Sequence, residues 1–490
     1  MTFRARSLSR TLLVLCVAGS AATACAPQFP AGGQPVPGVD SGEVPPTTYA
    51  FASRFGEGSS VAYSGQVQRH LLLDDLAAFI GALREDDYLG ETAEQVRDDL
   101  DFFFDYKNQG GAGDDPIRVA PAGGGVFLQE TYGEVGAPAS LREKLPDQDL
   151  GSTTPVIGVG DGSQLPTAVV EGWLTELGNL VIERSEGRVP KDPSGADIVP
   201  AFVTADGRDL QELTQKFLLG AVAFSQCAGD YLADGPEGKG LASDNVQQVD
   251  GQPYTVLEHH WDEGFGYFGA ARDLLHYTVD ERAGVDGRAD YRYGYHDTNA
   301  DGRIDATGEY NFGPARYAAK RDLATRGGSE TDFAAEAFQA FVDGRHLITS
   351  AGGALTEVQA TTLKGLRDSA ISAWEKAIAA SAVHYLNEVL EDMDRFATLC
   401  DDDSSKECYR FLDYAAHWSE LKGFALSLQF NPRSPLSSTQ HTTLQGLIGS
   451  SPVLPGAEET MISAYRADLL TARGLLGDVF AFDAVNLQTW

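Results

Sequence analysis

The chain has 490 residues, of which 42% are hydrophobic and 22% are charged, and these proportions are typical of a folded protein rather than a disordered one. Acidic residues number 71 and basic residues 37, which gives a formal net charge of −34. Nucleic acids and anionic lipid surfaces are bound through clusters of Lys and Arg. The charge therefore argues against both as partners, and it is compatible with a cation as ligand.

Residues 1–24 have the features of a signal peptide. Basic residues precede an apolar stretch at 12–24, which is too short to span a bilayer and ends in small residues. The small residues before Cys25 predict lipidation of this cysteine in a bacterial cell envelope, and the alternative is ordinary cleavage with Cys25 incidental. Because Ala26 rather than Asp follows, we expect an outer-membrane lipoprotein facing the periplasm or the surface, attached to the membrane only through its N-terminal lipid.

Helical periodicity dominates the chain after a tether at 25–48 that is rich in Pro and Gly. Apolar residues recur with helical spacing over seven segments, at 71–80, 168–183, 210–232, 331–347, 357–394, 408–428 and 458–480. Long alternating strand patterns are absent. The pattern predicts an all-α protein with two antiparallel helical bundles, at 49–295 and 311–490, and a calcium-type loop between them at 296–310.

Three cysteines lie in the body of the protein. Cys400 and Cys408 flank a short acidic loop, and the oxidising compartment predicts a disulfide between them. Cys227 lies in an apolar run and is expected to be a buried thiol.

An internal repeat marks the first candidate site. The pattern His-Trp-x-Glu-x-x-Gly-aromatic occurs at 260–267 and again at 417–424, which suggests that the two bundles arose by duplication. A His and a Glu three residues apart share one face of a helix, and an imidazole with a carboxylate is a reasonable pair of metal ligands. The candidate ligands of iron or another transition metal are His259, His260, Glu263, His417 and Glu420. The alternative is that the repeat preserves a packing contact between helices.

A second pattern resembles a calcium-binding loop. Residues 297–305 match the first nine positions of the motif D-x-N-x-D-G-x-I-D, in which oxygen ligands occur at alternate positions around the ion. Gly302 permits the sharp turn and Ile304 anchors the loop to the core. Position twelve is Gly308, and Glu309 is the acid that could serve in a loop one residue longer. The predicted calcium ligands are Asp297, Asn299, Asp301, Arg303, Asp305 and Glu309, and the alternative is a loop of Asx-turns without an ion.

Short motifs in a fixed order along the chain resemble the imelysin-like superfamily of bacterial envelope proteins, and in particular a lipoprotein branch of it with a domain of unknown function. These motifs lie at 63–69, 216–221, 259–263, 266–268, 297–305, 310–313, 320–322, 344–345, 417–420 and 430–432, and Gln226 belongs with them. The resemblance implies two helical bundles related by duplication. It also implies a connection with iron uptake through the motif Gly-x-His-x-x-Glu, whose His and Glu correspond to His260 and Glu263. Glu258 replaces the Gly of that motif.

Three functional hypotheses follow from these patterns. The first is a non-enzymatic envelope lipoprotein that binds a metal ion or an iron-containing ligand between its helical bundles. The second is a metallopeptidase with Glu263 as general base, which would also need an open coordination position on the metal. The third is a structural lipoprotein in which calcium staples the fold and the repeat is packing. No catalytic residue is predicted.

Overall fold

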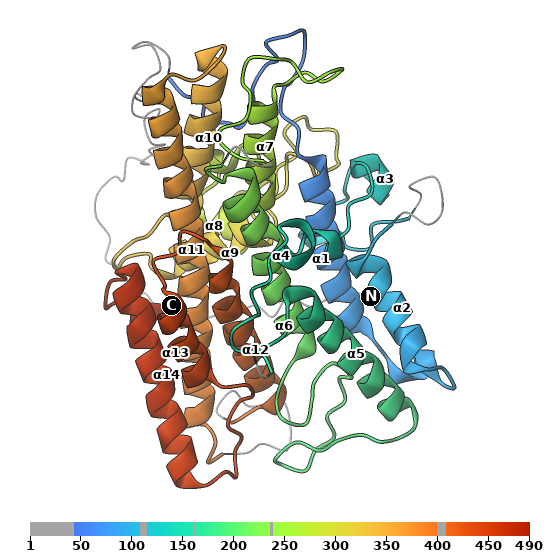
Figure 1. The fold of residues 1–490 in the computed structure, drawn as a ribbon. Helices are drawn as coiled ribbons and strands as arrows, with labels where there is room; N and C mark the ends of the chain where they lie inside the picture. Colours follow the sequence, from blue (N-terminus) through green and yellow to red (C-terminus); the bar gives the residue numbers. More distant parts are fainter. Residues whose placement is uncertain (1–43, 108–114, 161, 236–238, 399–407) are drawn as a thin grey trace, which may run out of the picture. The chain divides into compact units, whose positions relative to one another are not determined.

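The computed structural model describes residues 44–107, 115–160, 162–235, 239–398 and 408–490 (Figure 1). These ranges form helices and loops with a few isolated β-bridges, and they contain no sheet. The predicted all-α fold class is therefore confirmed. No helix within them is long and apolar enough to cross a membrane.

The α-helices occur throughout the described ranges. They are α1 Ser64–Ala82, α2 Ala93–Phe104, α3 Tyr132–Val135, α4 Pro146–Asp149, α5 Pro166–Ser185, α6 Leu210–Leu218, α7 Val256–Phe268, α8 Val279–Ala283, α9 Gly313–Ala324, α10 Phe333–Ala351, α11 Glu357–Asp394, α12 Phe411–Ser427, α13 Ser438–Ile448, α14 Glu459–Phe480 and α15 Asn486–Thr489. Five 3-10 turns join them, namely η1 Glu85–Tyr88, η2 Ala122–Gly124, η3 Arg142–Lys144, η6 Leu274–His276 and η7 Leu428–Phe430. Two π-helical segments, η4 Leu219–Phe224 and η5 Cys227–Tyr231, continue α6.

The longest helix, α11, illustrates why the periodicity was a good guide. Thr356 accepts a hydrogen bond from the backbone of Gln359, whose side chain caps Thr356 in return, so the sequence fixes where α11 begins. The helix has 38 residues and is about 57 Å long at 1.5 Å per residue. Its buried residues are mostly Ala, Leu, Val and Ile, and they pack against α9, α10, α12 and α14.

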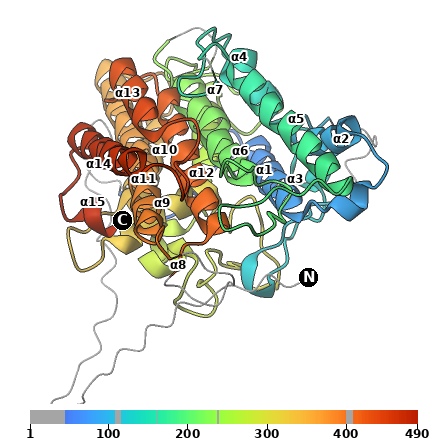
Figure 2. The same ribbon diagram turned by 90° about the horizontal axis from the view of Figure 1, so that it is seen from below.

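The helices form layers that position the site. Figure 2 shows α6, α7 and α12 between one group that contains α10, α11, α13 and α14 and another that contains α1, α2 and α5. The side chains of Trp261, Trp374 and Trp418 are at most 2% exposed and lie in the core. Helices from the two predicted bundles pack directly on each other, α6 on α12 and α7 on α10. The division into two bundles remains a prediction.

Some predictions concern residues outside the described ranges. Cys25, the predicted lipidation site, and Cys400, one half of the predicted disulfide with Cys408, both lie there. Cys227 is a buried free thiol, as the apolar run around it predicts, and burial raises its pKa.

Candidate functional site

The helix that begins at Leu210 changes its geometry in the middle of the protein. Asp209 caps α6 by accepting hydrogen bonds from the backbone of Gln211 and Glu212. After Leu218 the helix continues as η4 and then, after two α-helical residues, as η5, and both are π-helical. We call the whole element, 210–231, the irregular helix. Helical segments with π geometry are rare and occur frequently at functional sites.

Close approach of α12 accompanies the first π segment. A Cβ added to Gly220 would lie 2.3 Å from Oγ of Ser427 on α12, so only glycine fits at this contact. The hydroxyl of Ser427 donates to the carbonyl oxygen of Lys216 at 2.8 Å, which is one of the carbonyl groups near the point where α6 gives way to η4. Packing against α12 therefore supports the irregular geometry.

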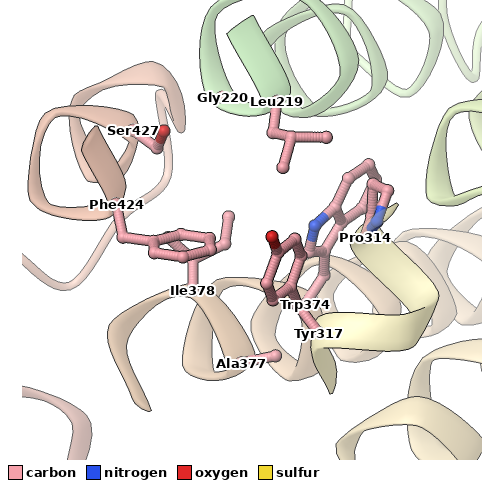
Figure 3. A pocket seen from close by; sticks show the side chains of 9 residues that line it. All are labelled: Leu219, Gly220, Pro314, Tyr317, Trp374, Ala377, Ile378, Phe424 and Ser427. Carbon is pink, nitrogen blue, oxygen red and sulfur yellow. The ribbon is translucent and has the colours of Figure 1, made fainter. Parts of the chain in front are cut away.

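Three cavities that are lined by described residues border the irregular helix. The first is an apolar void of about 10 Å³, large enough for about one water molecule (Figure 3). It lies between η4, α9, α11 and α12, and its lining includes Leu219, Trp374 and Phe424. A void of this size and polarity is a packing defect rather than a ligand site.

A larger cavity, of about 260 Å³, lies beside the second π segment. Ser225 and Gly229 of the irregular helix form one wall, and Phe430, the last residue of η7, lines another. Four prolines complete much of the lining, Pro146, Pro155, Pro166 and Pro432. The lining residues of this cavity carry no charge.

The third cavity, of about 170 Å³, is charged, and we call it the polar cavity. It lies where α1, α6 and α9 meet, because Asp74 belongs to α1, Gln215 to α6, and Arg316 and Lys320 to α9. The remaining lining residues are Tyr310, Asn311, Phe312, Gly313 and Tyr317. Arg316 and Lys320 are one helical turn apart, so α9 presents both cations to the same space.

The ionisable groups of the polar cavity have perturbed pKa values. Burial raises the pKa of Asp74 to about 7, against the opposing effect of Arg316. Burial and the nearby Arg316 lower the pKa of Lys320 to about 8. Groups with perturbed pKa values gather at functional sites more often than elsewhere, although buried ion-pair networks shift them too. Near pH 7 the Asp74 carboxyl can thus both accept and donate a hydrogen bond.

The predicted ligands of the first repeat are already engaged by the protein. Nδ1 of His260 lies 2.9 Å from the Ser243 hydroxyl, and burial lowers the pKa of this imidazole to about 4. Glu263 accepts a hydrogen bond of 3.1 Å from Gln66. His259 lies 3.5 Å from the same carboxylate and 3.2 Å from the carbonyl oxygen of Ala62. The structure therefore brings His259 and Glu263 together but directs His260 to a different neighbour.

The second repeat has other partners. Nδ1 of His417 lies 2.8 Å from Oδ2 of Asp392 on α11. Glu420 forms an ion pair of 3.2 Å with Lys216, which also pairs with Glu212. Although burial alone would lower it, the neighbouring Tyr317, Glu212 and Glu420 hold the pKa of Lys216 above its usual value. The two glutamates of the repeat therefore contact different helices. Glu263 of α7 contacts Gln66 of α1, and Glu420 of α12 contacts Lys216 of α6.

Packing residues are what the two repeats share. Trp261 and Trp418 are both fully buried, and each donates its indole N–H at 2.9 Å, to Phe341 carbonyl oxygen and to the Tyr465 hydroxyl. The glycines at the seventh position of each repeat also correspond. An added Cβ on Gly266 would lie 2.6 Å from Cβ of Tyr63, and one on Gly423 would lie 2.5 Å from Cβ of Lys216. These contacts favour the packing interpretation of the repeat.

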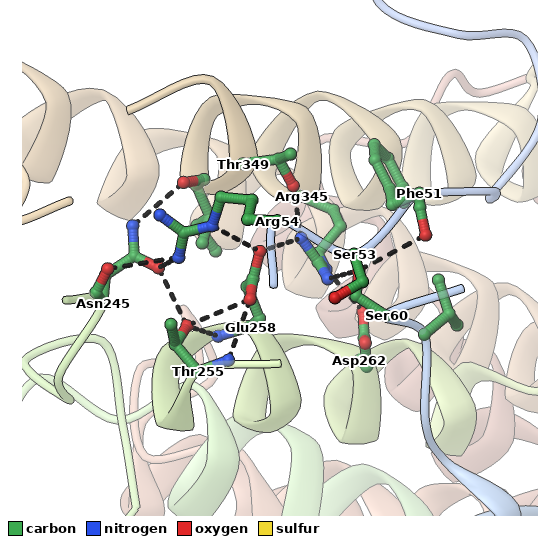
Figure 4. Close-up of polar contacts among 12 residues, drawn as sticks. Phe51, Ser53, Arg54, Ser60, Asn245, Thr255, Glu258, Asp262, Arg345 and Thr349 are labelled. Carbon is green, nitrogen blue, oxygen red and sulfur yellow. Dashed lines mark hydrogen bonds and ion pairs between the residues drawn. The ribbon is translucent and has the colours of Figure 1, made fainter. Parts of the chain in front are cut away.

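A buried ion network lies on a neighbouring face of α7 (Figure 4). The guanidinium of Arg345 lies 2.8 Å from Asp262 and 3.1 Å from Glu258, and all three side chains are fully buried. Arg54 lies 3.3 Å from Glu258, and the Tyr49 hydroxyl donates to Asp262 at 2.7 Å. The two acids and two arginines of this network balance in charge, although Nε of Arg54 has no hydrogen-bond partner.

Sequence reasoning passed over this network, although a pattern pointed to it. Glu258 and Asp262 are four residues apart and therefore share a helix face, and Glu258 stands where the resembled motif has glycine. Arg345 lies in another of the motifs that carry the resemblance. In the folded protein Glu258 pairs with both Arg345 and Arg54.

Metal ligands do not gather in the described part of the chain. No group of three or more His, Cys, Asp or Glu side chains that could hold a metal ion occurs there. The proposed transition-metal site therefore has no geometric support in those ranges beyond the pairing of His259 with Glu263.

The predicted calcium loop is tightly folded around its own side chains. Asp297 accepts hydrogen bonds from the backbone N–H groups of Asp301, at 3.2 Å, and Gly302, at 2.7 Å. Gly302 has φ of +85°, as the predicted sharp turn requires. Glu309 reaches across the loop, where Oε1 accepts from Thr298 N at 2.7 Å and Oε2 from Asp305 N at 2.8 Å.

The rest of the loop connects it to the body. Ile304 is 4% exposed, and its backbone pairs with Val126 and Leu128 through two hydrogen bonds of 2.8 Å. Asn299 accepts from the backbone of Asp301 at 2.9 Å, while the Arg303 side chain points to Glu130 at 2.9 Å. Of the predicted ligands, Arg303 would thus contribute only its carbonyl oxygen.

Comparison with known proteins yields one family. A family described only as a domain of unknown function (DUF4856) matches residues 187–280, which contain the irregular helix and α7. No curated protein and no solved structure matches the chain. The matched segment supplies one wall of every cavity described above, through Leu219, Ser225 and Gln215.

Proposed function

We propose that this chain is a non-catalytic lipoprotein of the bacterial cell envelope, related to the imelysin-like superfamily, that binds a ligand between its helices. The observation that supports ligand binding is the irregular helix, which lies within the segment matched by the family. This helix borders two cavities, of about 170 and 260 Å³. Cavities between helices are a usual place for ligand sites in helical proteins. The signal peptide and Cys25 support the location in the envelope.

The ligand implied by the resemblance is a metal ion or an iron-containing compound. The positive charge of the polar cavity favours an iron-containing compound over a free metal ion, because Arg316 and Lys320 would repel a free cation. The metallopeptidase hypothesis has less support, since His260 and Glu263 point to separate partners, Ser243 and Gln66. A catalytic zinc needs three protein ligands that converge on one open position.

Two measurements test this proposal on protein isolated from its native membrane without a tag. Elemental analysis together with native mass spectrometry is expected to find a bound compound at near one equivalent. A double variant, Glu263→Ala with Glu420→Ala, distinguishes the sites. Retention of the compound by the folded variant places it in a cavity, whereas loss of a stoichiometric metal would place it at the repeats. Protein that carries neither a compound nor a metal would contradict ligand binding.

Lipidation is tested separately on Cys25. Cells grown with labelled palmitate are expected to incorporate label into the wild-type protein, which should fractionate with the outer membrane. The variant Cys25→Ser should lose both properties. A freely soluble, unlabelled wild-type protein would contradict the proposed anchor.

A second candidate function is a calcium-stapled structural protein. The match to the calcium-loop motif motivates this candidate, and the carboxylates of Asp297 and Glu309 close the loop by accepting hydrogen bonds from its own backbone N–H groups. Calcium prefers six to eight oxygen ligands, and a weak site would suffice outside the cytoplasm. In this function the ion would fasten the loop to the segment that includes Val126 and Leu128.

A further inference from the structure

The helix α9 carries cations without acidic partners. Arg316, Lys320 and Arg321 have no acidic group of the described residues within the 4.0 Å that defines an ion pair. Arg321 is 6% exposed, and two of its guanidinium nitrogens lack a hydrogen-bond partner. A cation that loses water without gaining a partner lowers the stability of the folded protein. The chain has a net charge of −34, so acidic residues that could pair with these cations are plentiful, and their unpaired state indicates a use other than stability.

Two of these cations, Arg316 and Lys320, line the polar cavity. Their contacts within the protein are weak. Arg316 lies 3.5 Å from the Tyr310 hydroxyl, and the ammonium of Lys320 lies 5.2 Å from the ring centre of Tyr317. Both groups therefore have donors to offer to a molecule in the cavity.

The start of α9 adds positive potential to the same space. Phe312 and Gly313, the N-cap and first residue of α9, line the cavity, and no side chain caps this end of the helix. The first N–H groups of a helix have no partner within it, and the helix dipole places partial positive charge there. Anions bind at such ends when other cations assist.

One acid faces these cations across the cavity. Asp74 lines the wall formed by α1, and no hydrogen bond to another side chain or backbone group of the described residues engages it. Since burial raises its pKa to about 7, it does not fully neutralise Arg316 and Lys320 near neutral pH. Asp74 is therefore placed to accept a hydrogen bond from the ligand that the cations hold.

We propose that the polar cavity binds a small anion whose carboxylate or phosphate group lies against Arg316 and Lys320 and whose hydroxyl or amino group donates to Asp74. Guanidinium and ammonium groups bind both kinds of oxyanion, and Arg does so with two parallel hydrogen bonds. A volume of about 170 Å³ admits a small metabolite but no peptide segment. This inference rests on the proposed ligand-binding function, and it names the chemistry of one site.

The test uses the full mature chain and two probes, malate for a hydroxy-carboxylate and inorganic phosphate for a phosphate. Calorimetric titration and thermal unfolding are measured at constant ionic strength. We compare Arg316→Gln and Lys320→Met with Lys364→Met, in which the lost cation is 48% exposed and pairs with Asp234 outside the cavity. One probe is expected to bind the wild type and the control alike, and at least tenfold more weakly to each cavity variant.

A second readout separates binding from a structural role. Because Lys320 lacks an acidic partner, Lys320→Met should raise the midpoint of thermal unfolding in the absence of any anion, whereas a structural lysine would lower it when lost. Binding of malate would assign a carboxylate, and binding of phosphate would assign a phosphate group.

Several results would overturn the inference. It fails if neither probe binds, if the cavity variants bind as well as the wild type, or if Lys320→Met destabilises the empty protein. If the natively bound compound persists in both cavity variants, ligand binding as such stands and only this site is removed.

Discussion

Lys216 of α6 packs directly against Gly423 of α12, where only a glycine leaves room for it. A Cβ built on Gly423 would lie 2.5 Å from Cβ of Lys216, well inside van der Waals contact. The same lysine extends past this point to pair with Glu420, three residues before the glycine. In the first repeat, Gln66 lies against Gly266 and donates to Glu263, so the same arrangement recurs with an amide in place of the ammonium.

Replacement of Gly423 by alanine should therefore destabilise the protein. The new methyl group meets Cβ of Lys216, which cannot withdraw without a shift of α6. Overpacking of this kind costs about 1–3 kcal/mol in the free energy of unfolding. Urea denaturation followed by circular dichroism measures the change.

The matched control is Gly474→Ala on the exposed side of α14, where an added Cβ meets nothing within 4 Å. That substitution should stabilise the protein by about 0.5–1 kcal/mol, because glycine is unfavourable within a helix. Equal effects of the two substitutions would mean that α6 and α12 are not in close contact.

Loss of Arg345 should be among the most damaging single changes. Its removal leaves Glu258 and Asp262 buried with too few cations, and a broken buried pair costs about 3–5 kcal/mol. Arg345→Met is compared with Arg188→Met, whose side chain is 59% exposed and whose loss should change stability by less than about 0.5 kcal/mol. The free energy of unfolding of each variant, measured by urea titration, gives the two changes to be compared.

Neutralisation of both acids provides the internal check on that prediction. The triple variant with Arg345→Met, Glu258→Gln and Asp262→Asn should regain part of the lost stability, because the uncompensated charges are gone. If the triple variant is no more stable than Arg345→Met alone, lost packing rather than charge explains the damage.

The pairing of His417 with Asp392 should make stability depend on pH. Burial opposes it, but Asp392, Glu388 and Glu420 together raise the pKa of His417 above its ordinary value of 6.5. Because the pKa of His417 is higher in the folded protein than in the unfolded chain, protonated His417 stabilises the fold. This stabilisation is fully present below pH 6.5 and is lost as the pH rises through the pKa of the folded state.

The comparison of wild type with His417→Gln tests this dependence, since other titrations largely cancel in the difference. The free energy of unfolding of the wild type should exceed that of the variant by more at pH near 6 than at pH near 9. In an Asp392→Asn background the excess at pH near 6 should be smaller, because Asp392 makes the largest contribution that raises the pKa of His417. A difference that grows with pH would contradict the raised pKa.

Calcium should raise the midpoint of thermal unfolding relative to a sample with chelator if the loop at 297–309 binds the ion. Stabilisation at one hundred times the dissociation constant is about 2.7 kcal/mol. Asp301→Ala should abolish the shift, while Asp250→Ala, at an exposed turn outside the loop, should retain it. Identical midpoints with calcium and with chelator would leave the loop as a set of Asx-turns.

Periodicity predicted the long helices well, because each has a wide apolar face and a clear end. The segment expected at 357–394 coincides with α11, and the one expected at 458–480 differs from α14 by one residue. Shorter or more polar helices such as α2, α9 and α13 were not predicted. Helix α9 is hard to recognise because half of its buried residues are alanine and two others are charged, which gives little hydrophobic contrast.

The polar cavity could not be predicted from spacing. Asp74, Gln215 and Lys320 are separated by more than a hundred residues each, and only the packing of α1, α6 and α9 brings them together. The π geometry of the irregular helix was also beyond sequence reasoning, since its residues satisfy an α-helical pattern equally well. The repeat, in contrast, was found readily, but its shared contacts are those of Trp and Gly rather than of His.

The irregular helix also constrains how this segment can change in length. Each residue of an α-helix advances by about 100° around the axis, so one residue added or removed turns everything beyond it to a different neighbour. The π segments at Leu219–Phe224 and Cys227–Tyr231 set the direction in which Ser225 and Gly229 face the larger cavity. A single-residue deletion within 219–231 should therefore reorient those walls while leaving α6 and its cap intact, and related chains should keep this stretch free of gaps even where its side chains differ.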